Sequence, residues 1–154
     1  MKANKELSAT LQAVLVDLIE LGIQGKQAHW NVVGTNFRDM HLQLDEIIEV
    51  ARDLSDVVAE RMRALELLPD GRSETVTQTT SLPKFPADQV DTSQVTDLIV
   101  ERLNTVAGTC RRVHDAVDEA DPTTADILHE VIEKIEQYAW MVGAEKQKPR
   151  KRPA

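Results

Sequence analysis

The chain has 154 residues, 42% hydrophobic and 29% charged, which suits one domain with a full apolar core. No stretch approaches the roughly 18 apolar residues of a membrane-spanning helix, and the first residues lack the apolar segment of a secretion signal. The single cysteine, Cys110, excludes an intrachain disulfide and favours a reducing compartment, so we expect a cytoplasmic protein without membrane contact.

The net charge of −8 is unevenly distributed along the chain. Removing the five basic residues of segment 146–154 from the 18 in the chain leaves 13 basic residues against 26 acidic ones. An acidic body attracts cations, whereas a basic tail can attract nucleic acid. We therefore predict one domain over residues 1–145 and a basic tail over 146–154, with its charges on Lys146, Lys148, Arg150, Lys151 and Arg152.

Two long helices are predicted in the first half of the chain from apolar residues at 3.6-residue spacing. The first runs from about Lys5 to Trp30 and is followed by a tight connection over Asn31–Thr35. The second runs from about Asn36 to Leu67, nearly nine turns, and needs apolar partners along its whole length.

A long polar loop over Pro69–Thr92 separates these helices from two more. We expect a short helix of its own within it, after Pro86. The third long helix is predicted over Ser93–Ala120 and the fourth over Asp121–Glu145, with proline at its first position. The pattern predicts an all-α fold, an antiparallel four-helix bundle whose long crossover carries a short extra helix.

The second predicted helix carries two pairs of candidate ligands, His41 with Asp45 and Asp56 with Glu60. All four lie on one stripe, but eleven residues of helix rise about 16 Å, so one straight helix cannot bring both pairs to one metal. The pairs are equidistant from a point between residues 50 and 51. If two copies of this helix pack antiparallel about that point, His41 faces Glu60 of the other copy, and Asp45 faces Asp56.

The turn between the first two helices adds a further candidate ligand. His29 and His41 are equidistant from its centre near residue 35, so we expect them to be neighbours. The predicted site combines His29, His41 and Asp45 of one chain with Asp56 and Glu60 of another. Imidazole and carboxylate ligands suit iron, and also manganese or zinc. The alternative is that the charged stripe is simply a solvated helix face.

These residues also resemble the signature of the Dps family (DNA-binding protein from starved cells). The similar positions are His29–Phe37, His41, Asp45–Glu46, Asp56, Ala59–Arg61, Asp121–Asp126 and Trp140. The resemblance implies a ferritin-like bundle in a shell of twelve identical subunits. It also implies ferroxidase sites with one or two irons each, made of the same five residues, where hydrogen peroxide oxidises ferrous iron. Ferric mineral would collect inside, and the reaction would protect DNA.

The resemblance suggests further roles, each with an alternative. Trp30 would supply an electron beside the site, or be a buried aromatic at the hinge. Asp121, Asp126 and Glu130 would line an iron-entry pore, or cap a helix. The tail would hold DNA without sequence preference, lost at high salt and implying association with the nucleoid, or would only solubilise the shell.

Two other functions remain open from the sequence. The protein would be a DNA-compacting structural protein with incidental iron binding, or a metal-dependent hydrolase that cleaves N-acyl amides at the same site. His114 and His129 lack a matching array of partner ligands, so we expect them to be surface or core residues. Tyr138 and Trp140 are expected in the core, with the alternative, from the resemblance, that Trp140 lies near the site.

Overall fold

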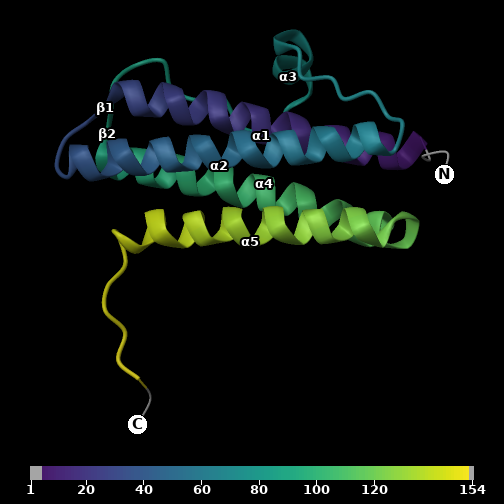
Figure 1. Ribbon diagram of the computed structural model, residues 1–154. Coiled ribbons are helices and arrows are strands. Elements are labelled where there is room, and N and C mark those ends of the chain that lie inside the picture. Colours follow the sequence, from purple (N-terminus) through teal and green to yellow (C-terminus); the bar gives the residue numbers. More distant parts are fainter. Residues whose placement is uncertain (1–4, 153–154) are drawn as a thin grey trace.

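The computed structural model describes residues 5–152 as an all-α bundle (Figure 1). Predictions about residues 1–4 and 153–154 lie outside the described residues. The helices are α1 (Lys5–Asn31), α2 (Phe37–Ala64), α3 (Ser73–Thr79), α4 (Thr92–Ala120) and α5 (Pro122–Ala144). Hairpins α1–α2 and α4–α5 pack together, and the crossover between them carries α3. The predicted bundle with a crossover helix is confirmed. None of the helices within 5–152 has both the length and the apolar character to cross a membrane.

The four long helices begin and end within three residues of their predicted limits. At the α1–α2 turn, Gly34 has φ 114° and Asn36 has φ 58°, conformations that glycine and asparagine adopt most readily. The α1–α2 hairpin is tight because Gly25 lies against α2: a Cβ added there would stand 3.0 Å from Cγ1 of Ile48. Pro122 is the first residue of α5, as predicted.

The short crossover helix lies at Ser73–Thr79, so its predicted position after Pro86 is wrong. Near its end the crossover is extended instead: β2 (Val90–Asp91) pairs in parallel with β1 (Val32–Val33), which follows α1. Backbone pairing at that point leaves no room for a helix, and Asp91 instead caps α4 by accepting from the Ser93 and Gln94 amides.

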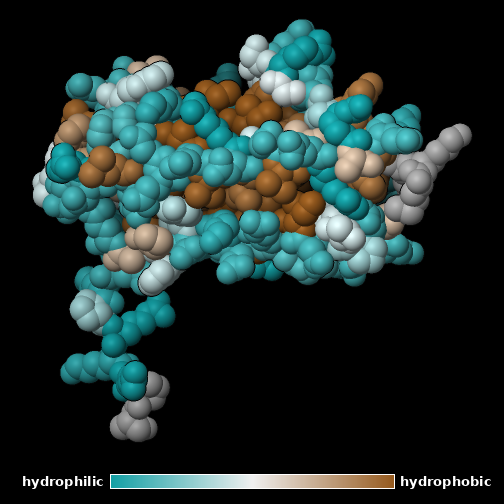
Figure 2. All heavy atoms as spheres, viewed as in Figure 1, coloured by the Kyte–Doolittle hydropathy of each residue, from teal (hydrophilic) through white to brown (hydrophobic). Residues whose placement is uncertain are grey.

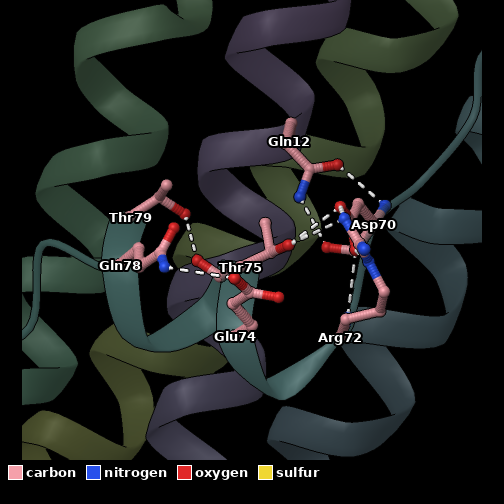
Figure 3. Close-up of polar contacts among 7 residues, drawn as sticks. All are labelled: Gln12, Asp70, Arg72, Glu74, Thr75, Gln78 and Thr79. Atoms are coloured by element: carbon pink, nitrogen blue, oxygen red, sulfur yellow. Dashed lines mark hydrogen bonds and ion pairs between the residues drawn. The ribbon is translucent and has the colours of Figure 1, made fainter.

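Asp70 fixes the start of α3 to α1 (Figure 3). The Gln12 side chain donates to the carbonyl oxygen of Asp70 at 2.7 Å and accepts from its amide at 2.9 Å. The Asp70 carboxylate accepts from the guanidinium of Arg72 and the hydroxyl of Thr75, and these hydrogen bonds hold its pKa well below the ordinary value. These hydrogen bonds satisfy the polar groups of Asp70 just before α3 and hold the start of the helix against α1.

Two buried charged side chains hold the rest of the crossover, and neither was predicted. Asp17 is 2% exposed and accepts from the Ser81 amide at 2.8 Å and the Thr109 hydroxyl at 2.8 Å. Arg102 is 1% exposed and donates to Gln24 and to two crossover carbonyl oxygens. Burying a charge is unfavourable unless such partners replace water, so these contacts fix the path of the crossover.

Large apolar side chains are also exposed on the outside of the bundle. On the face shown in Figure 2, apolar patches flank α2 on both sides. Exposed apolar residues include Ile23 and Trp30 on α1, Leu42 and Val57 on α2, and Trp140 on α5. Trp140 is 63% exposed, so its expected place in the core of the single chain is wrong, whereas Tyr138 packs partly buried against the core. Exposed apolar surface of this extent is typical of protein interfaces.

Candidate metal centre

The α1–α2 hairpin brings His29 and His41 together, as their positions about the turn predicted. Their rings stack with centroids 3.7 Å apart and an interplanar angle of 23°. His29 is 8% exposed, and the ring of Phe37 lies against the imidazole of His41, with centroids 5.1 Å apart. The pair is therefore positioned by the hairpin itself, and Phe37 is a neighbour that the sequence pattern did not identify.

Reciprocal hydrogen bonds select the tautomer of both rings. Nδ1 of His29 lies 3.0 Å from the carbonyl oxygen of His41, and Nδ1 of His41 lies 3.0 Å from that of His29. Because a carbonyl oxygen only accepts, each Nδ1 carries the hydrogen, and in the neutral ring this leaves the electron pair on Nε2. Imidazoles that bind metals are held in this way through the second nitrogen.

Asp45 adds a negative charge beside the histidines. Its Oδ1 lies 2.7 Å from Nζ of Lys26 and 3.2 Å from Nδ1 of His29. The hydrogen bond from Lys26, with smaller contributions from the positive charges nearby, lowers the pKa of Asp45. The carboxylate is therefore ionised at neutral pH and contacts the same nitrogen that the His41 carbonyl holds.

Asp56 and Glu60 are exposed and remote from the histidines of their own chain. Both belong to the same unbroken helix as His41, and the fifteen residues from 41 to 56 span about 22 Å. Within residues 5–152, no three His, Cys, Asp or Glu side chains gather as a metal site. His29 thus lies beside both His41 and Asp45, but the described part of one chain does not complete a metal site, and Asp56 and Glu60 lie far along the same helix.

Trp30 follows His29 and is 70% exposed, so the alternative of a buried hinge aromatic is wrong for the single chain. Its indole borders a hollow of about 330 Å³ between α1 and α2. Lys26, Arg52 and apolar side chains of α1 also line that hollow. An open apolar hollow beside the histidine pair is the kind of surface that a second subunit would cover.

The three acidic residues at the start of α5 lie in different environments. Asp121 is 7% exposed, and its Oδ2 accepts from Nη2 of Arg61 and from the Thr124 hydroxyl, each at 2.5 Å. These partners, Thr124 first, lower its pKa. Its carboxylate thus joins α5 to the end of α2, whereas Asp126 and Glu130 are exposed. The pore role of Asp121, Asp126 and Glu130 stays a prediction.

Cys110 and the basic tail lie outside the histidine site. Cys110 is fully buried, and burial raises the pKa of its thiol to about 12, so this sulfur is unreactive at neutral pH. In the tail, Nζ of Lys146 contacts Asp97 at 2.5 Å, while Lys148, Arg150, Lys151 and Arg152 are exposed. Figure 1 shows the tail leading away from the bundle.

His114 and His129 lie at the surface, one of their two predicted places, and they contact each other: their Nε2 atoms lie 2.7 Å apart. The signal was present in the sequence. These residues are equidistant from a point between Asp121 and Pro122 in the α4–α5 turn, the same relation that predicted the neighbours His29 and His41.

Comparison with known proteins agrees with this geometry. The model of the ferritin-like domain matches residues 8–151. The DNA protection during starvation protein 2 of Deinococcus radiodurans is 36% identical over 143 residues, covering 91% of this chain. The chain belongs to the Dps family. It spans 58% of the length of that Deinococcus relative.

Solved Dps structures share the whole fold. The Dps92 crystal structure from Deinococcus radiodurans superposes with a TM-score of 0.90 at 36% identity, covering 93% of this chain and 87% of that one. The Dps of Microbacterium arborescens in its high iron form superposes with a TM-score of 0.86 at 32% identity, covering 94% of this chain and 97% of that one.

Proposed function

We propose that this protein is a ferroxidase of the Dps family that oxidises ferrous iron with hydrogen peroxide between two subunits. Twelve copies would form the shell that stores the product. The observation that carries the proposal is the His29–His41 pair, whose Nε2 electron pairs are kept free by reciprocal backbone hydrogen bonds. An iron-bearing Dps structure at 32% identity supports the choice of metal.

The shared site follows from the register of α2. Asp56 and Glu60 have no hydrogen bond or ion pair within residues 5–152, and both are exposed. An antiparallel copy of α2, centred between residues 50 and 51, would bring them to His41 and Asp45. Two identical sites then form at each twofold axis.

The residues have complementary roles in the proposed reaction. His29 and His41 would bind ferrous iron as neutral ligands, while Asp56 and Glu60 would offset its charge and favour the ferric product. Two ferrous ions each lose one electron, the O–O bond of the peroxide breaks, and two protons complete two water molecules. Asp45 would orient His29 through Nδ1. Removing peroxide and ferrous iron together is the proposed route of DNA protection.

Mixed assemblies test whether the site is shared. His41→Ala and Asp56→Ala assemblies should each lose rapid oxidation of ferrous iron by peroxide, measured by ferric absorbance. When the two variants are co-expressed, half of the dimers contain one of each and have one intact site out of two. The mixture should recover about a quarter of the wild-type rate.

Two results would refute the proposal. A mixture no more active than its parents would mean that the ligands do not come from different chains. Parents that keep the normal rate would mean that these residues do not bind the iron that reacts. Shell size by light scattering separates either result from failed assembly.

The basic tail supports DNA binding as a second function. All five of its basic residues are exposed, on a segment that leads away from the acidic body. Twelve such tails on one shell would bind cooperatively, though each is weak alone. Removal of residues 146–154 should abolish the DNA gel shift at low salt and leave iron oxidation unchanged. A persistent gel shift would contradict this role.

A further inference from the structure

A second histidine pair lies in the other hairpin, outside the proposed ferroxidase centre. His114 of α4 and His129 of α5 stack with ring centroids 4.6 Å apart and an interplanar angle of 29°. Their Nε2 atoms are only 2.7 Å apart. Two helices therefore hold two imidazole nitrogens at direct contact.

An aspartate lies behind each ring. Nδ1 of His114 is 3.1 Å from Oδ1 of Asp115, and Nδ1 of His129 is 3.7 Å from Oδ1 of Asp126. A carboxylate beside Nδ1 favours the tautomer with its hydrogen there, which leaves the electron pair on Nε2. Two such electron pairs facing each other repel unless a proton or a metal cation lies between them.

The surroundings allow a metal to complete its coordination. The pair borders an open hollow of about 240 Å³, lined also by Arg111, Asp115 and Ile132. The Arg111 guanidinium is paired with Glu136 at 2.6 Å, which offsets the one positive charge beside the hollow. The His129 side chain is 59% exposed, so water can supply the remaining ligands.

The required rearrangement is small. A tetrahedral zinc ion with Zn–N bonds of about 2.0–2.1 Å separates two ligand nitrogens by roughly 3.3 Å. Opening the pair by about half an ångström is within reach of a side-chain rotation at a partly exposed surface. No third His, Cys, Asp or Glu side chain of residues 5–152 completes the group, so at least two positions would stay open.

We propose that His114 and His129 form a surface site for a divalent transition metal of the zinc and copper type, separate from the ferroxidase centre. Paired imidazoles bind Zn²⁺ and Cu²⁺ more tightly than Fe²⁺, according to the general order of stability for these ions. The site would therefore hold a metal different from the one oxidised at the α2 interface.

Zinc titration tests this site with the full chain in its assembled form. The background is His41→Ala with Asp56→Ala, which removes zinc binding at the ferroxidase centre. In that background, competition with a chromophoric zinc chelator should show one zinc ion per chain. Adding His114→Ala or His129→Ala should each weaken zinc binding by at least about 10-fold, because one ligand remains. Asp126→Asn, which keeps both ligands, should weaken it less.

Arg111→Ala is the matched control: it changes the same hollow but no ligand, so zinc affinity should be equal or higher. Shell size and helical circular dichroism identify any variant that fails to fold, and the two histidine variants provide independent tests. Equal zinc binding with and without the histidines would overturn the proposal. So would a pair that binds no zinc and only shares a proton, as seen by ¹⁵N NMR of Nε2.

Discussion

The two histidine pairs belong to hairpins whose turns lie at opposite ends of the bundle (Figure 1), and they are built in different ways. At the α1–α2 hairpin, each Nδ1 is held by a backbone carbonyl oxygen, and the Nε2 atoms are free for ligands from outside the chain. At the α4–α5 hairpin, aspartates lie behind the rings and the Nε2 atoms face each other. Similar positions about a turn thus produce one pair that our proposal completes with a second subunit and another that our proposal completes within a single subunit.

The comparison shows that ring orientation, and not only proximity, decides which nitrogens of a histidine pair face each other and which are held by other groups. Backbone carbonyls fix the first pair as soon as the hairpin folds, since they cannot turn away or ionise. The aspartates behind the second pair are exposed side chains, so its geometry can adapt to a proton or a metal. Variants at the two hairpins test this difference.

Activity should separate the two pairs most clearly. His29→Ala should slow peroxide-dependent iron oxidation by at least about 100-fold, because even residues behind metal ligands contribute 10- to 100-fold. His114→Ala should leave the rate within about 2-fold. Stopped-flow absorbance of the ferric product measures both. Equal losses in the two variants would mean that the α4–α5 pair also takes part in oxidation.

Subunit association tests the shared nature of the first site. Glu49 and Arg52 are exposed and equidistant from the proposed twofold point of α2. Glu49 of each chain should therefore face Arg52 of the other chain. Arg52→Glu places four carboxylates near the axis and should weaken dimer association by about 30-fold, or about 2 kcal/mol. Sedimentation velocity measures the change.

The double variant Glu49→Arg with Arg52→Glu is the control, because it exchanges the charges and restores opposite pairs. It should assemble like the wild type. If the double variant is as weak as Arg52→Glu alone, the centre of the α2 interface lies elsewhere.

Asp45 tests how much a carboxylate near Nδ1 adds to metal affinity when backbone carbonyl oxygens already hold the His29–His41 pair. Asp45→Asn removes the charge near Nδ1 of His29, and we expect about a 10-fold loss of ferrous affinity, measured by anaerobic calorimetry. Glu46→Gln is the matched control one residue along α2. Burial raises the pKa of Tyr138, and the charge of Glu46 adds to that rise, so this carboxylate lies near Tyr138. An equal loss in both variants would indicate a general effect of charge.

The ion pair of Asp121 with Arg61 should have the smallest effect, on stability alone. Asp121→Asn should lower the free energy of unfolding by about 1–2 kcal/mol at pH 7, measured by urea denaturation. The folded-state pKa of Asp121 is lowered, so its contribution is complete above the unfolded pKa of about 4 and disappears as the pH falls through the lower folded value. The difference between wild type and variant should shrink below about pH 4; a constant difference would contradict this cause.

The sequence predicts the helices and the first histidine pair because both depend on spacing. Apolar periodicity located the four long helices, and distance from a turn placed His29 beside His41. The ferroxidase role of the five residues stays a prediction, since two of them must come from another chain.

Contacts between distant segments were not predictable in the same way. Asp17 and Arg102 look like surface charges in the sequence, and only the folded crossover supplies their buried partners. The position of α3 depends on Gln12, which is 58 residues from Asp70. The second histidine pair did obey the spacing rule, and was missed because no matching array of ligand pairs accompanied it in the sequence.

Arg61 has a consequence beyond stability, because it directly follows Glu60 in α2. Its hydrogen bonds to Asp121 and Thr124 restrain the rotation of the last turns of α2 about the helix axis. The contacts with the first residues of α5 therefore also fix the direction in which the neighbouring Glu60 side chain points. In a shared centre, contacts inside one subunit would orient a ligand that binds metal in the next subunit.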